Sequence, residues 1–309
     1  MAHEPKLSQK EAMKHYSVMT REVLAALSVQ KGEVVVDATY GQGGHSKALK
    51  AEAKIKLISI DADPAAGAGV VNANFGDLKE VADGLGIKAI DKIVFDLGWN
   101  KGQLISGRGF SFMHDEPLVM SYGDKPRSGF TAAEMLNTFT EKALADIFFG
   151  YGEERYARRI AAAVVERRKT KEFETTLELV EVIKDSVPAA YRRGRLHPAT
   201  KSFQALRIAV NNELGVIEQG LAAAWELLSC GGRIAVITFH SIEDRLVKRT
   251  FAALAKGGAN PAKPDARPEG SRGRLLYKKP LIPSQKEVKE NAASRSAKLR
   301  AIEKLCQEK

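Results

Sequence analysis

The sequence is poor in cysteine and in long apolar runs, and each scarcity excludes a class of protein. Its two cysteines, Cys230 and Cys306, are far apart and neither belongs to a CxxC pair, so we expect a reducing compartment and no disulfide framework. No apolar run approaches the roughly 20 residues that a membrane helix needs. Residues 1–14 are polar and lack the apolar core of a signal peptide. We therefore expect a cytoplasmic protein without a membrane partner.

Histidines are few, whereas positive charge is abundant. The six histidines are scattered, and no spacing of Cys, His or Asp matches a zinc or iron motif, so the sequence predicts no metal site. The formal net charge is +10, and residues 263–309 hold 13 Lys and Arg against 6 Asp and Glu. Such an excess attracts polyanions through phosphate contacts. Contact with nucleic acid therefore explains this basic tail better than a merely solvated chain end does.

One glycine-rich stretch, residues 34–46 (VVVDATYGQGGHS), organises the rest of the chain. A β-branched run ends at Asp37, and Gly41, Gly43 and Gly44 follow before a segment compatible with a helix. Glycine lets a backbone approach a ligand closely, and ligands of open α/β sheets bind at the carboxyl ends of strands. The spacing matches neither the GxGxxG dinucleotide motif nor the P-loop. An acid before such a loop suits S-adenosylmethionine; the alternative is an ordinary strand–turn–helix connection.

Four short apolar runs predict the fold. They lack the alternation of half-exposed strands, as parallel strands buried on both faces do, and occupy residues 33–37, 55–61, 90–96 and 233–240. Helical segments between them favour an α/β doubly wound sheet. Residues 64–74 are too few for a normal crossover, so we expect a truncated one with a third strand near residues 70–73.

More than a hundred residues without clear buried strands separate Asp96 from Arg233, and they predict a helical insertion. Capping boxes begin at Thr131 and Thr175, and residues 153–168 form an amphipathic pattern with arginines mostly off its apolar stripe. Residues 202–228 form one long helix or two. We predict a discontinuous sheet domain, 1–103 with 206–309, and an insertion, 104–205, that recognises RNA. Its arginine groups, 155–159 and 192–195, contact phosphates or are merely solvated.

Several separated stretches, in order, resemble one family, the RsmH/MraW family of bacterial 16S ribosomal RNA (cytosine-N4)-methyltransferases. The similar segments include residues 37–46, 60–64, 96–98, 108–113 (RGFSFM), 151–161 (YGEERYARRIA), 197–214 (HPATKSFQALRIAVNNEL) and 231–251 (GGRIAVITFHSIEDRLVKRTF). The resemblance implies a Rossmann-like S-adenosylmethionine-dependent methyltransferase sheet, and N4-methylation of a specific cytidine in small-subunit ribosomal RNA within a ribosomal particle. It leaves open whether the protein forms a homodimer.

The resemblance also implies which residues bind S-adenosylmethionine: Gly43, Gly44, His45, Asp61, Phe75, Asp96 and Gln103. Our interpretation of the residues adds Gly41 and Asp37, the latter either pairing with the cofactor's cationic amino group or only ordering the loop. Asp61 ends the second strand, where an acid can accept both hydrogens of a ribose diol, or else cap a turn. Phe75 flanks adenine or belongs to the core.

Asp96 is the predicted catalytic residue. The lone pair of a cytosine amine is delocalised into the ring, so an acceptor that holds the amino hydrogens can align the nitrogen for attack, and catalysis is largely positioning. The predicted substrate residues, each with core packing or a structural bond as its alternative, are Trp99, Arg108, Phe110, Phe112, His197 and His240.

The chain departs from the family pattern at residues 100–102 and 116–122, where hydroxyls, an acid and an arginine are missing. We expect an active variant enzyme, because the predicted cofactor contacts remain. Two alternatives stand beside it: a DNA amino-methyltransferase, disfavoured by the lack of a Pro-Pro-aromatic motif, and a non-catalytic RNA-binding assembly factor that keeps the fold.

Overall fold

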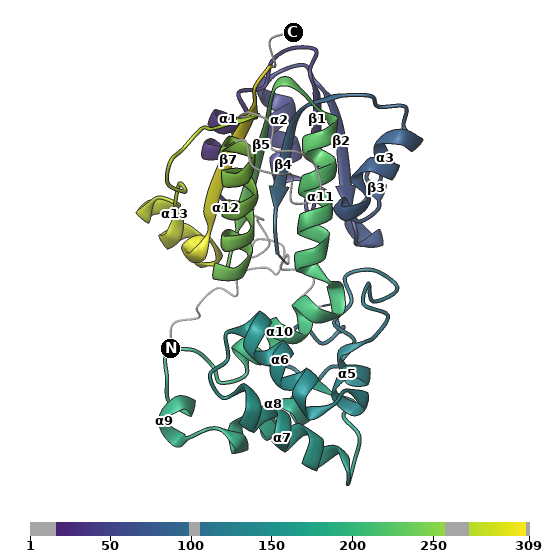
Figure 1. Ribbon diagram of the computed structural model, residues 1–309, viewed down its shortest axis with the longest axis vertical. Coiled ribbons are helices and arrows are strands. Elements are labelled where there is room, and N and C mark those ends of the chain that lie inside the picture. The colour runs from purple at the N-terminus through teal and green to yellow at the C-terminus, as the bar shows by residue number, and fades with distance from the viewer. Residues whose placement is uncertain (1–16, 99–105, 257–271, 307–309) are drawn as a thin grey trace, which may run out of the picture. The chain divides into compact units, whose positions relative to one another are not determined.

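The computed structural model describes residues 17–98, 106–256 and 272–306, and the chain divides into two compact units (Figure 1). The sheet unit comprises residues 1–61, 65–97 and 220–309, and the helical unit comprises residues 62–64 and 98–219. The helical unit thus extends beyond the predicted insertion, 104–205, at both ends. The boundary between residues 219 and 220 falls within one helix, α11 (Glu213–Leu227).

The sheet unit is built on seven strands in the order β3-β2-β1-β4-β5-β7-β6. Strands β3 to β5 of this order pair in parallel, and β7 and β6 are antiparallel to their neighbours. The predicted α/β fold class is therefore confirmed, and the third strand expected near residues 70–73 is the two-residue β3. The bounds are β1 Val34–Asp37, β2 Lys56–Asp61, β3 Val71–Asn72, β4 Ile90–Asp96, β5 Leu228–Thr238, β6 Gly273–Leu275 and β7 Lys298–Lys304.

Helices cover both faces of the sheet, as a doubly wound fold requires. Val94 packs in the core with residues of α1 and α2, whereas the next residue, Phe95, points to the other face and contacts Phe75. In Figure 1, α11 and α12 lie in front of the sheet and α1 and α2 behind it. The helices are α1 Thr20–Leu27, α2 Gly44–Glu52, α3 Leu78–Gly84, α11 Glu213–Leu227, α12 Ser241–Lys256 and α13 Gln285–Glu290, with 3-10 turns η1 Pro64–Ala66, η2 Phe75–Asp77 and η3 Ala292–Ser296.

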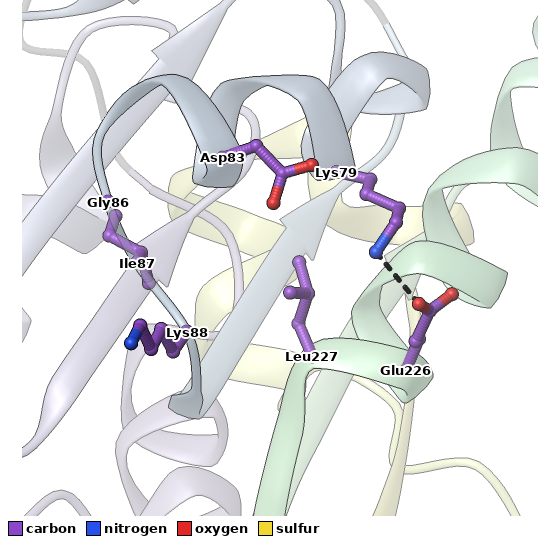
Figure 2. Close-up of a pocket in the computed structure, with 7 residues that line it drawn as sticks. All are labelled: Lys79, Asp83, Gly86, Ile87, Lys88, Glu226 and Leu227. Atoms are coloured by element: carbon purple, nitrogen blue, oxygen red, sulfur yellow. Dashed lines mark hydrogen bonds and ion pairs between the residues drawn. The ribbon is translucent and has the colours of Figure 1, made fainter.

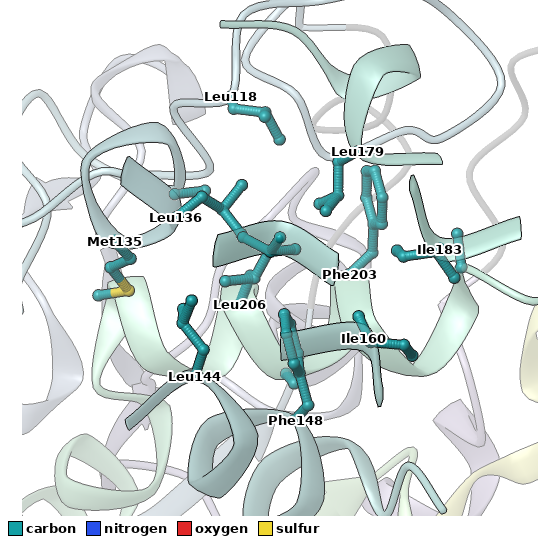
Figure 3. Close-up of a cluster of buried hydrophobic side chains, with 14 of the residues drawn as sticks. Leu118, Met135, Leu136, Leu144, Phe148, Ile160, Leu179, Ile183, Phe203 and Leu206 are labelled. Atoms are coloured by element: carbon teal, nitrogen blue, oxygen red, sulfur yellow. The ribbon is translucent and has the colours of Figure 1, made fainter. Parts of the chain in front are cut away.

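The helical unit encloses a second apolar core (Figure 3). Phe148, Ile160 and Leu206 come from three different helices and are all fully buried. Both predicted capping boxes are present, at Thr131 and Thr175. No helix within the described ranges is long and apolar enough to cross a membrane. The helices are α5 Ala132–Thr138, α6 Glu141–Gly152, α7 Ala157–Arg168, α8 Thr176–Ser186, α9 Ala189–Arg192 and α10 Thr200–Asn211.

The expectation of no disulfide was wrong. Cys230 and Cys306 form a disulfide, with Cα atoms 5.0 Å apart. Strand β7 pairs antiparallel to β5, with Arg233 opposite Glu303, so the residues just beyond this pair are brought together despite a separation of 76 residues. A spacing argument cannot reveal such a contact, because it depends on the partner of the last strand.

Candidate cofactor and active site

The glycine loop joins the carboxyl end of β1 to the amino end of α2. The physical reason for a glycine differs from one position of the loop to the next. Gly43 has φ +76°, and a Cβ there would lie 2.5 Å from the Tyr40 ring. At Gly44 a Cβ would lie 1.6 Å from Ser17 Oγ. Gly41 has φ +55° and nothing within 4 Å of its Cβ position. Gly44 is therefore required by packing and Gly43 by its positive φ, whereas Gly41 faces open space that a ligand can use.

Two predicted acids hold this loop in place. The Oδ2 atom of Asp61 accepts a hydrogen bond from the Gly41 N–H at 2.6 Å. Asp37 is fully buried and accepts hydrogen bonds from the Ser46 hydroxyl at 2.7 Å and the Thr39 N–H at 3.3 Å. Burial raises the pKa of Asp37 against the opposing effect of His45. Of the two roles considered for Asp37, this geometry favours ordering of the loop.

His45 and Asp96 form the most polar part of the site. Asp96 ends β4, and its N–H donates to Thr39 Oγ1 at 2.6 Å. His45 is 4% exposed, and its Nε2 lies 3.4 Å from Asp96 Oδ2, an ion-pair distance too long for a good hydrogen bond. Burial acts to lower the pKa of His45, but the carboxylates of Asp96, Asp37 and Glu287 outweigh it and raise the pKa.

Within the described residues, three buried atoms of this pair lack a hydrogen-bond partner: both ring nitrogens of His45 and Oδ1 of Asp96. Buried polar atoms are rarely left unsatisfied, because each costs roughly 1–3 kcal/mol. The Asp96 side chain is also 21% exposed, so it is within reach of a ligand. Together with the open space at Gly41, these orphaned atoms fit a polar cofactor at the carboxyl edge of the sheet.

Phe75 lies in η2 beside this edge. Its ring meets Phe95 edge to face at 5.5 Å, and a Cβ on Gly220 of α11 would lie 2.7 Å from it. The ring is thus held by the core on two sides and remains half-buried, which leaves both of its predicted roles open. The predicted site residues Trp99 and Gln103 lie outside the described residues, as does the variant segment 100–102.

Arg108 and Phe110 belong to the internal packing of the helical unit. The Arg108 guanidinium contacts Asp63 Oδ2 at 2.8 Å and donates to the Tyr122 carbonyl at 2.7 Å. Phe110 is 8% exposed and stacks on Tyr122 with ring centroids 5.4 Å apart. Because these partners already engage both side chains, the geometry favours their structural alternatives over substrate contact.

Two histidines predicted to contact the substrate have different surroundings. His197 stacks on Phe112 at 4.7 Å with the rings nearly parallel, and burial followed by the charge of Lys184 lowers its pKa. His240 precedes α12, and its Nε2 lies 3.0 Å from Glu243, which also accepts from the Phe239 and His240 N–H groups. Thus His240 participates in a helix cap, whereas His197 and Phe112 form a half-exposed aromatic pair.

A cavity of about 400 Å³ lies elsewhere in the sheet unit (Figure 2). It is bordered by the connection from α3 to β4, and Lys79 pairs with Glu226 across it at 2.8 Å. This is the amino edge of the sheet, whereas ligands of such folds bind at the carboxyl edge, so we do not assign the cofactor to it. Its lining residues are Lys79, Asp83, Gly86, Ile87, Lys88, Glu226 and Leu227.

Sequence reasoning missed three contributors to the site: Ser17, Thr39 and Glu287. Thr39 stands within the glycine stretch, so a hydroxyl there was a usable signal. Ser17 and Glu287 come from distant segments; Glu287 is 7% exposed and accepts from the Met19 N–H at 2.6 Å. Nothing local in the sequence connects either residue with the glycine loop.

Several known proteins resemble this chain over most of its length. Residues 12–305 match the sequence model of the MraW methylase family. A ribosomal RNA small subunit methyltransferase H from Carboxydothermus hydrogenoformans is 44% identical over 94% of this chain and 98% of its own length. The protein of the same name from Persephonella marina is 41% identical over 95% and 100%. Among solved structures, an rRNA methylase from Streptococcus thermophilus aligns with a TM-score of 0.40 and 12% identity over 93% of this chain and 95% of that one.

Proposed function

Because the chain belongs to the MraW methylase family, we propose that it methylates N4 of a specific cytidine in small-subunit (16S) ribosomal RNA. The family makes it a methyltransferase with S-adenosylmethionine as cofactor, as the sequence predicted. The names of its relatives, small-subunit ribosomal RNA methyltransferases, support the class of substrate. A cytoplasmic location is part of this proposal, since ribosomal RNA is the proposed substrate.

The observation that carries the proposal is the position of Asp96. It ends β4 at the same edge as the glycine loop, with Oδ1 buried and unpartnered within the described residues. Residues 41–45 and Asp61 would hold the cofactor, which supplies an electrophilic methyl group when bound. No metal is needed to displace a sulfonium methyl group.

In this mechanism the residues of the chain mainly position the reacting amine. Asp96 Oδ1 accepts an N–H of the cytosine amine and orients the nitrogen towards the methyl group. The neighbouring His45 Nε2, 3.4 Å from Asp96 Oδ2, helps to hold the carboxyl group in place and leaves Oδ1 available as the acceptor. The Thr39 hydroxyl fixes the Asp96 backbone, which keeps the acceptor at the strand end.

The helical unit would recognise the RNA, since it lies outside the cofactor-binding sheet and carries the arginine groups. Two alternatives remain to be separated from this proposal. A DNA amino-methyltransferase would act on a different polymer, and a non-catalytic assembly factor would bind the particle without turnover.

The proposal is tested with labelled S-adenosylmethionine and small ribosomal subunits from a strain that lacks the native modification. We expect label at N4 of one cytidine, and its loss in Asp96→Ala. The matched control is Asp91→Asn on the same strand, because Asp91 accepts the Val34 N–H at 2.8 Å, far from the carboxyl edge. Label in DNA alone, binding without transfer, or full turnover by Asp96→Ala would each contradict it.

A further inference from the structure

Six arginines of the helical unit share one property. All six side chains are exposed, and none forms an ion pair with a carboxylate within the described part of the chain. We call this set the arginine face: Arg155, Arg158, Arg159, Arg192, Arg193 and Arg195.

Aromatic contacts join the two halves of the arginine face. The Tyr156 and Tyr191 rings meet at 5.0 Å, and the Arg155 guanidinium lies 4.7 Å from the first ring and 5.0 Å from the second. Glu154 is fully buried and accepts from the Tyr191 hydroxyl at 2.6 Å and the Tyr156 N–H at 2.8 Å. These contacts fix the start of α7 beside α9, and so bring the two arginine groups together at Arg155 and Tyr191.

Several other basic residues of the chain have carboxylate partners. In the helical unit Lys142 pairs with Asp146 at 2.7 Å, and Lys169 pairs with Glu166. In the basic segment near the C-terminus, Arg300 pairs with Asp244 at 2.7 Å. The charge of that segment is therefore partly neutralised within the fold, whereas the charge of the arginine face is not. Unpaired like charges repel one another, and a bound polyanion removes this repulsion.

We propose that the arginine face binds the phosphate backbone of the RNA substrate; this inference rests on the proposed function. Arginine suits the task because its planar guanidinium donates two parallel hydrogen bonds to a phosphate. The face continues along the chain into Leu196, 55% exposed, and into the Phe112–His197 stack. Charged groups beside flat rings are the combination that single-stranded nucleic acids require, since phosphates and bases are contacted together.

The test compares two double variants that each remove two positive charges from the helical unit: Arg192→Ala/Arg193→Ala on the face, and Lys142→Ala/Lys169→Ala away from it. Binding to 16S ribosomal RNA is measured across a salt series. Two lost phosphate contacts should reduce the salt slope of log K by about 1.4 and weaken binding about 25-fold at 0.1 M salt. The lysine variant should match the wild type. Equal behaviour of the two variants would overturn the inference, and a thermal melt of each confirms that it folds.

Methyl transfer and cofactor affinity distinguish this inference from the proposed function. The arginine variant should raise KM for small subunits with kcat and S-adenosylmethionine affinity unchanged. If the wild type methylates subunits and this KM stays the same, the inference fails and the proposed function stands. If the wild type transfers no methyl group but the arginine variant binds RNA more weakly than the wild type, the proposed function fails and the arginine face stands. Equal loss of DNA and RNA binding would support a phosphate site that does not select RNA.

Discussion

The contact between Gly44 and Ser17 allows a strict test of why the glycine loop has its sequence. An alanine Cβ at residue 44 would lie 1.6 Å from Ser17 Oγ and 2.8 Å from Ser17 Cβ, but 3.8 Å from Ser17 Cα. Gly44 begins α2 with no positive φ, so alanine there meets no backbone strain. Overpacking of this kind costs about 1–3 kcal/mol. Ser17→Gly removes both clashing atoms and should relieve that cost.

We expect Gly44→Ala to lower the free energy of unfolding by about 1–3 kcal/mol, and Ser17→Gly to lower it by about 0.5–1 kcal/mol through added chain flexibility. The double variant should resemble Ser17→Gly alone, which corresponds to a coupling energy of about 1–3 kcal/mol. The four proteins are unfolded in urea in a Trp99→Phe background. Trp225, 4% exposed in the sheet unit, is then the only tryptophan and reports that unit.

Additive effects of the two substitutions would refute this reasoning. Titration with S-adenosylmethionine adds a second comparison. If the double variant regains cofactor affinity, Gly44 is needed because of Ser17. If it stays stable but does not bind, the added Cβ occupies space that the cofactor requires.

Three further predictions concern charge and the disulfide. Despite burial, hydrogen bonds from Lys171 and nearby N–H groups lower the pKa of Glu178 from 4.5 to about 2, so its stabilisation exists above pH ~4.5 and is lost as pH falls towards 2. After discounting for solvent around Lys171, Glu178→Gln should cost about 1–2 kcal/mol at pH 7 and little at pH 2, measured by urea unfolding; an equal cost at both pH values would contradict this. The pKa of His45 is raised, so its stabilising charge is present below pH ~6.5 and is lost as pH rises through the raised pKa. An NMR titration that gives His45 a pKa below the ordinary histidine value would disprove this. The cysteines close a loop across 76 residues, so Cys306→Ser should cost about 2–4 kcal/mol, and a reductant should destabilise the wild type equally but leave the variant unchanged; an unaffected wild type would disprove the bond.

Strands buried on both faces were predictable because their apolar runs are local signals. The predicted runs at residues 33–37, 55–61 and 90–96 correspond to β1, β2 and β4 within one residue at each end. The capping boxes at Thr131 and Thr175 were equally local, since cap and acid are three residues apart. In contrast, β7 has charged residues on its length, and Arg300 is accommodated only because Asp244 of α12 faces it. That partner is 56 residues away in the sequence, and no local pattern predicts the contact.

The limits of the helical unit were harder to predict for a related reason. Phe203 and Leu206 of α10 are buried in the core of the helical unit, yet their apolar spacing would suit either core. At the site, the strand-end rule located Asp37, Asp61 and Asp96, and their roles in cofactor binding and catalysis stay predictions. The rule could not predict how these acids are oriented. Their partners, the Gly41 N–H and the imidazole of His45, are positioned by the path of the loop, which the rule does not specify.

The position of β7 has a consequence for biosynthesis. This strand lies between β5 and β6, although it follows every other strand in the sequence. A ribosome making the chain therefore releases the parallel strands β1 to β5 and the whole helical unit before the sheet can close over β5. Glu287, whose charge acts on His45, also emerges late. A chain that stops before β7 would thus lack both the closed sheet and the full set of charges around the cofactor site, so methyl-transfer competence is acquired only after β7 has been made.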